Sequence, residues 1–156
     1  MMTPTQTTLQ QVMADAAVDT TLSLVAALAG LPKDTVVTMV EAGLPMMAHV
    51  ADADPWVFKA MYAQSVTYLP PPTEAFYTKL AKNATARQAL EADFQLMYGP
   101  MAETINRDVA AQASTTEAQA SQVLATTMPA VVRALGRANT NINEMGFGRQ
   151  LRKLQA

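Results

Sequence analysis

The 156-residue chain contains no cysteine and only one histidine, His49. Without cysteine the chain forms no disulfide bond and performs no thiolate chemistry, which fits a reducing compartment. Zinc sites usually need two or more histidine or cysteine ligands, so a lone histidine disfavours a transition-metal site. We therefore predict no metal and no cofactor. His49 with Asp52 and Asp54 forms the pattern H-x-x-D-x-D, which we interpret as a structural histidine beside a helix-capping aspartate.

Charged residues are also scarce, at 15% of the chain against roughly 25% in an average soluble domain. Half of the residues are apolar, so either small and polar residues or a partner must cover part of the surface. The net charge is −2, but residues 133–156 carry five cations and one carboxylate. With Phe147 as the one ring able to stack among them, these cations are too few for a nucleic-acid footprint, so nucleic acid is not an expected partner.

Long hydrophobic runs are absent as well. No stretch of about 20 apolar residues predicts a membrane span. The first residues lack the basic and apolar regions of a signal peptide, so we expect a cytoplasmic protein. No nucleophile elbow, phosphate-binding loop or dinucleotide-binding glycine pattern occurs, and the carboxylates are scattered. The sequence therefore predicts a protein that is not an enzyme.

Helical periodicity, in contrast, runs along most of the chain. Apolar residues recur at steps of three and four, no segment alternates with period two, and no Asn-Gly or Asp-Gly turn is present. We predict an all-α protein, a single multihelical bundle, with a helical domain at 1–138 and a basic C-terminal segment at 139–156. The expected helices cover residues 7–30, 33–42, a segment from Pro45 to 51, 55–66, 73–82, 86–98, 101–113 and 117–138. Capping boxes formed by Thr85 with Gln88 and by Ser114 with Glu117 precede the helices at 86–98 and 117–138. We expect a loop at 139–148 and a short turn at 149–155.

A proline-bearing pattern occurs twice, 84 residues apart. When residues 20–52 are placed over 104–136, Pro45 meets Pro129 and Val25-Ala26-Ala27 meets Val109-Ala110-Ala111. Six of 33 positions are identical, but alanine makes up 29 of the 156 residues, so chance matches are common. The pattern favours either an ancient duplication with a pseudo-twofold axis or two unrelated helices that share a proline. In both cases proline should start or kink a helical segment at residues 45 and 129.

The same segments resemble a known family. A Leu-Pro or Met-Pro step in an apolar helix, preceded by STTEAQASQVL and followed by VVRALGRAN, resembles the YidB-like family of bacterial proteins, and LPKDTVVTMVEAGLPMMAHVA is similar in a looser way. The resemblance covers about residues 20–52 and 104–139. It implies a multihelical bundle without established activity, and it supplies no catalytic residues.

Several functions remain open at this stage. We predict a helical protein–protein interaction or assembly protein that self-associates. The alternative is a module that binds a hydrophobic or lipid-like ligand in a cavity lined by methionine and aromatic residues, since flexible thioethers adapt to irregular partners. A third hypothesis is an enzyme that uses tyrosine, aspartate or glutamate side chains in a pocket. The candidate interaction residues are Met46, Met47, Trp56, Phe58, Tyr62, Phe147, Arg149, Leu151, Arg152 and Lys153.

Overall fold

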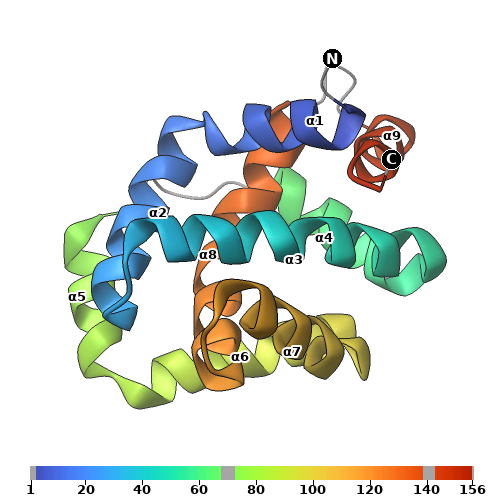
Figure 1. Cartoon of the computed structure of the whole chain (residues 1–156). Coiled ribbons are helices and arrows are strands. Elements are labelled where there is room, and N and C mark those ends of the chain that lie inside the picture. The colour runs from blue at the N-terminus through green and yellow to red at the C-terminus, as the bar shows by residue number, and fades with distance from the viewer. Residues whose placement is uncertain (1–2, 68–72, 139–142, 156) are drawn as a thin grey trace.

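The computed structural model describes residues 3–67, 73–138 and 143–155, and within these ranges every regular element is a helix (Figure 1). The all-α prediction is confirmed. The expectations for residues 139–142 lie outside the described residues. The helices are α1 (Pro4–Met13), α2 (Ala16–Ala29), α3 (Lys33–Ala53), α4 (Pro55–Val66), α5 (Glu74–Lys82), α6 (Ala84–Tyr98), α7 (Met101–Ala113), α8 (Glu117–Arg137) and α9 (Glu144–Lys153).

The single helix expected over residues 7–30 is wrong, because the chain divides into α1 and α2 at Asp15. The Asp15 Oδ1 atom accepts hydrogen bonds from the backbone N–H groups of Ala17 at 2.9 Å and Val18 at 3.3 Å. Aspartate is a favoured N-cap because its side chain satisfies donors that a helix start leaves free. The local cap therefore prevails over an apolar periodicity that runs through it.

The helix break expected at Pro45 is also wrong, since α3 continues through this proline, whereas α8 continues through Pro129 as the helix expected over 117–138 does. A kink at either proline stays a prediction. A proline in a helix interior costs about 3 kcal/mol through a lost hydrogen bond and a clash. Here the flanking side chains lie in the core: Leu44 and Met47 are fully buried, as are Met128 and Val131. Burial of this face before and after each proline stabilises the uninterrupted helix.

Three helix caps differ from the sequence expectation. Helix α6 begins at Ala84 with Asn83 as its cap, and α8 uses a capping box formed by Thr116 and Gln119. Helix α9 begins inside the expected loop, where Asn143 Oδ1 accepts from Gly146 N at 2.7 Å. Asparagine and threonine recur so often before these helices that composition alone leaves the choice of cap open.

The helical hairpins α2–α3 and α7–α8 correspond at an offset of 84 residues. Helices α3 and α8 coincide at both ends, and α2 and α7 end at equivalent residues. The residues that follow α2 and α7 are both left-handed, Gly30 with φ 67° and Ser114 with φ 55°. Every buried position of α2 and α3 falls on a buried position of α7 or α8.

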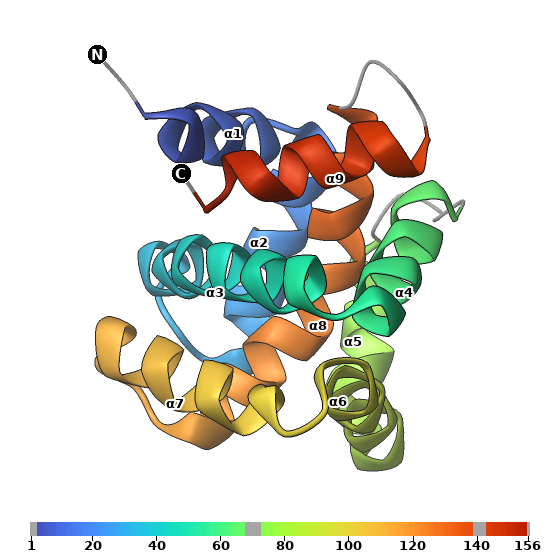
Figure 2. The ribbon, with the colours of Figure 1, turned by 90° about the vertical axis from the view of Figure 1, so that its right-hand side faces the viewer.

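The two hairpins interlock rather than lie apart. Helix α2 packs against α8, α3 packs against α7, and α3 also contacts α8. Helices α1 and α9 cover one end of the molecule, and α6 and α7 form the opposite end (Figure 2). Helix α5 lies in the chain between the two hairpins and contacts α2 and α6.

Candidate functional site

The C-terminal helix α9 is part of the bundle. Phe147 and Leu151 are fully buried and Leu154 nearly so, and all three belong to the same core as α3. Helix α9 contacts α1, α3, α4 and α8. Phe147 and Leu151, which the sequence analysis chose as candidate interaction residues, are therefore occupied inside the chain.

An aromatic contact fixes α9 against α4. The Phe147 ring lies 5.9 Å from the Phe58 ring in an edge-on arrangement and 5.8 Å from the Tyr62 ring, measured between centroids. Aromatic pairs at such distances add about 0.5–1.5 kcal/mol beyond the area they bury. Gly148 lies beside this contact, where a Cβ would sit 3.5 Å from the Phe58 ring and 3.4 Å from Arg152 Nη1, both ordinary van der Waals distances, so the approach does not depend on the glycine.

Outside this contact, each helix exposes one stripe. Apart from the first residue of each helix, Glu144 and Pro55, which are also exposed, the stripe on α9 consists of Met145, Arg149, Arg152 and Lys153, and the stripe on α4 consists of Trp56, Lys59, Ala63 and Val66. Both follow the three- and four-residue spacing of one helix face. Trp56 is 57% exposed and Met145 is 71% exposed, which is unusual for side chains of this size. We call these two stripes together the α4–α9 surface.

The cations of the α4–α9 surface have no acidic partner in the part of the chain that the structure describes. The ion pairs there join Lys33 to Asp19, Arg107 to Asp108 and Arg137 to Asp15. Two of the five C-terminal cations thus have partners within the chain: Arg137 pairs with Asp15, and Arg133 Nη1 donates to Ser65 O at 3.1 Å. The other three lie on α9 and are exposed.

The ten residues chosen from the sequence separate into three groups. Phe147, Leu151 and Met47 are core residues with no exposed surface. Met46, Phe58 and Tyr62 are half-buried. The exposed group, which remains available to a partner, contains Trp56, Arg149, Arg152 and Lys153. Trp56, at 57% exposed, is therefore not part of the domain core.

The opposite end of the molecule is acidic. Residues 84–117, which form α6, α7 and the start of α8, contain five carboxylates and two arginines. Leu96 and Met101 are also exposed there, at 72% and 40%. We call this region the acidic end. It combines negative charge with exposed apolar side chains, the counterpart of what the α4–α9 surface offers.

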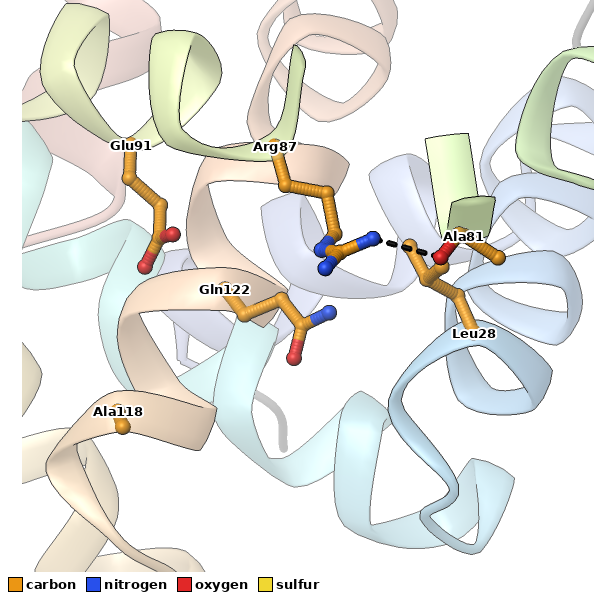
Figure 3. Close-up of a pocket in the computed structure, with 6 residues that line it drawn as sticks. All are labelled: Leu28, Ala81, Arg87, Glu91, Ala118 and Gln122. Carbon is orange, nitrogen blue, oxygen red and sulfur yellow. Dashed lines mark hydrogen bonds between the residues drawn. The ribbon is translucent and has the colours of Figure 1, made fainter. Parts of the chain in front are cut away.

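A polar concavity of about 420 Å³ lies where α2, α5, α6 and α8 meet. Figure 3 shows Arg87 directed at the carbonyl of Ala81, and its Nη1 atom donates there at 2.6 Å and to Leu80 O at 2.9 Å. The guanidinium therefore satisfies the free carbonyls at the end of α5. The remaining lining residues, Leu28, Glu91, Ala118 and Gln122, contain no pairing of a nucleophile with a base, so this concavity supports a structural role for Arg87.

A second concavity, of about 470 Å³, lies on the acidic end and includes Glu103, Asn106 and Glu117. Sequence reasoning treated the carboxylates as a scattered, solvated set and overlooked Asn106. A signal was available, because the 84-residue offset aligns Asn106 with Leu22. A polar side chain at the position of a core leucine marks a difference between the hairpins that composition does not show.

Neither a metal-binding cluster nor a single membrane-spanning helix is found among the described residues. No three histidine, cysteine, aspartate or glutamate side chains in the described ranges gather closely enough to hold a metal ion. No single described helix has the length and apolar character to cross a bilayer, and the α1–α2 pair meets those criteria only together, with a 75° bend between its helices.

No family model, no curated protein and no solved structure matches the chain. The resemblance to the YidB-like family therefore stays a prediction.

Proposed function

We propose that the chain is a non-enzymatic helical protein that self-associates through the α4–α9 surface. The observation that carries this proposal is the exposure of Trp56 and Met145 on stripes whose cations have no acidic partner among the described residues. Tryptophan and arginine are the residue types most enriched among interface hot spots. The contact between Phe147, Phe58 and Tyr62 supports a preformed surface, which lowers the entropy lost on association.

The occupant that fits this surface best is the acidic end of a second copy. That end supplies carboxylates for the cations of α9, and exposed Leu96 and Met101 for the apolar side chains. Such charge complementarity sets orientation and encounter rate more than it sets affinity. The contact would join two different surfaces, and α9 lies at the end of the molecule opposite α6 and α7 (Figure 2), so it would be heterologous and would generate a ring or an open chain.

We also infer that the two helical hairpins descend from a duplication and are related by a pseudo-twofold axis. The exchange of α2 with α7 and of α3 with α8 turns the α2–α8 contact into the α3–α7 contact. The coincident helix ends and buried positions support the same relation. The faces that pair the hairpins are then already used within one chain, which leaves self-association to surfaces outside them. The cytoplasmic location expected from the sequence also remains a prediction.

The alternative, a hydrophobic or lipid-like ligand, has less support. Met39, Met47 and Met61 are fully buried within the core rather than along an open space. The apolar concavity beside Pro129, lined by Met128 and Tyr98, measures about 80 Å³, whereas ligand sites usually span roughly 300–1,000 Å³.

The proposal is tested by the mass of the protein in solution, measured by light scattering over a wide concentration range at low and high salt. We expect masses above the 16.7 kDa of one chain at low salt, and a shift toward that value at high salt. Arg149→Glu with Arg152→Glu should give a monomer, and Trp56→Ala should weaken association. Lys79→Glu with Lys82→Glu is the matched control, because these exposed cations lie on α5.

A charge exchange makes the test specific. Glu91→Lys with Asp93→Lys on the acidic end should also give a monomer. When mixed with the Arg149→Glu, Arg152→Glu variant, it should restore association. A wild type that is monomeric at every concentration and salt, or a mixture that stays monomeric while each variant remains folded, contradicts the proposal. A monomer that carries a small hydrophobic compound in native mass spectrometry supports the alternative.

A further inference from the structure

The concavity on the acidic end is built by the α6–α7 turn, the first half of α7 and the start of α8. Its volume is about 470 Å³, and its polar side chains come from three helices. The lining residues are Gln95, Gly99, Pro100, Ala102, Glu103, Asn106, Glu117, Ala118 and Ser121. No lysine or arginine is among them, although two carboxylates are.

Asn106 in this concavity lacks a hydrogen-bond donor. Its side chain is 6% exposed, lines the concavity, and has a buried Oδ1 atom without a hydrogen-bond partner. A buried acceptor left unpaired costs the full desolvation of that group. In the other hairpin the equivalent residue is Leu22, 2% exposed, so packing at this position does not require an amide. The unpaired oxygen therefore points to a donor from outside the chain.

The carboxylates Glu103 and Glu117 also indicate a missing partner when the two hairpins are compared. In the α2–α3 hairpin, Lys33 Nζ lies 2.6 Å from Asp19 Oδ1 and joins the two helices. At an offset of 84 residues, Asp19 becomes Glu103 and Lys33 becomes Glu117. The second hairpin thus keeps the carboxylate, replaces the ammonium with a second carboxylate, and forms no ion pair with either within the described ranges.

We propose that this concavity binds a primary alkyl-ammonium group, which takes the place that Lys33 fills in the first hairpin. An alkyl-ammonium has three N–H donors, and the site offers two carboxylates that match its charge, Glu103 and Glu117, with the neutral Oδ1 atom of Asn106 as a third acceptor. Hydrogen bonds between an ammonium and a carboxylate are roughly twice as strong as neutral ones. The group can belong to a free amine or to a lysine side chain of another copy, and the site is independent of whether the chain self-associates.

The test uses n-butylammonium chloride, which reproduces the end of a lysine side chain, and follows the side-chain amide signals of Asn106 by NMR. The protein is the full chain with Arg149→Glu and Arg152→Glu, so that failure of self-association does not affect the result. We expect saturable shifts at Asn106, Glu103 and Glu117. Tetramethylammonium at equal ionic strength, which has no N–H donor, should produce none.

Two variants transplant the residues of the first hairpin and should preserve the fold. Glu117→Lys places an ammonium of the chain's own in the site and should abolish binding. Asn106→Leu should weaken it about fivefold or more. Lys33→Glu creates a carboxylate pair beside Leu22 and should not produce a new site.

Equal shifts with tetramethylammonium, or undiminished binding in folded Glu117→Lys, overturn the proposal. Equal binding by Asn106→Leu overturns the part assigned to the amide. In the wild type, loss of association on adding n-butylammonium, but not tetramethylammonium, would identify the lysine of a second copy as the source. Binding without that loss would identify a free amine.

Discussion

Arg137 donates two hydrogen bonds to the Oδ2 atom of Asp15, from Nε at 3.1 Å and from Nη2 at 2.8 Å. The other oxygen of this carboxylate caps α2. One side chain thus starts a helix and ties the α1–α2 turn to the end of α8. Burial raises the pKa of Asp15, but the hydrogen bond and charge of Arg137, with the two backbone N–H groups, outweigh it and lower the pKa from its usual 3.8.

This lowered pKa predicts an acid-sensitive contribution to stability. A carboxylate with a depressed pKa stabilises the fold above its unfolded pKa, and the contribution is lost as pH falls through the folded pKa. At neutral pH, Asp15→Asn should lower the free energy of unfolding by about 1 kcal/mol, because Asn still caps and the half-exposed pair is screened. Asp15→Ala should lower it by about 2 kcal/mol.

Urea denaturation at a series of pH values checks this. Between about pH 5 and pH 3 the wild type should lose more stability than Asp15→Asn, so that the two curves converge. Curves that stay parallel would show that the pair contributes nothing that depends on the charge of Asp15.

Gly136 predicts a second stability effect, since α8 approaches α4 closely at this residue. A Cβ at Gly136 would lie 2.6 Å from Ser65 O and 2.9 Å from Ser65 Cβ, so the α4 backbone would have to move. Gly136→Ala should destabilise the protein by about 2–3 kcal/mol.

Gly43→Ala is the matched control for that variant. Its Cβ would lie 3.0 Å from Leu124 Cδ2, the far end of a flexible side chain, and alanine favours the helix by about 0.5–1 kcal/mol. We expect stability within about 1 kcal/mol of wild type. Equal losses in the two glycine variants, measured by denaturant midpoints, would contradict the close approach to Ser65.

The sequence predicted elements well where a local signal and the packing agree. Asp54 followed by Pro55 marks the start of α4, and the Asp54 side chain does accept from Trp56 N at 2.9 Å. Prediction failed where packing opposes local preference. The interior of α3 contains a proline that local rules treat as a break, yet buried neighbours on both sides keep the helix continuous.

The candidate surface was predictable only in part. The exposed cations of α9 were identified from the charge of the C-terminal segment. Periodicity could not show that Phe147 and Leu151 turn inward, because that depends on α3 and α4, which are distant in the chain. Asn106 was missed for a related reason: an unpaired buried amide exists only with respect to its neighbours in space.

The two helix-interior prolines allow a test of how alike the hairpins are. Pro45 and Pro129 occupy the same position in helices of equal length. Alanine at either site restores a backbone N–H, and proline costs about 3 kcal/mol relative to alanine in a helix interior. We expect Pro45→Ala and Pro129→Ala each to raise the free energy of unfolding by about 1–3 kcal/mol, with values that agree within about 1 kcal/mol. Effects of opposite sign in thermal unfolding would show that the two helices are not equivalent.

The last prediction compares the two hairpins at the position where they differ most. Asn106 has a buried oxygen without a partner, whereas its counterpart Leu22 fills the same core position with an apolar side chain. Asn106→Leu should raise the free energy of unfolding by about 1–3 kcal/mol, because it removes an unpaired acceptor and adds apolar burial. Leu22→Asn should lower the free energy of unfolding by about 3 kcal/mol or more, since it buries an amide in an apolar position without a hydrogen-bond partner. Denaturation without any amine present separates this effect from ligand binding. If Asn106→Leu instead destabilises the protein, the amide contributes to the fold itself and its oxygen is not left unsatisfied.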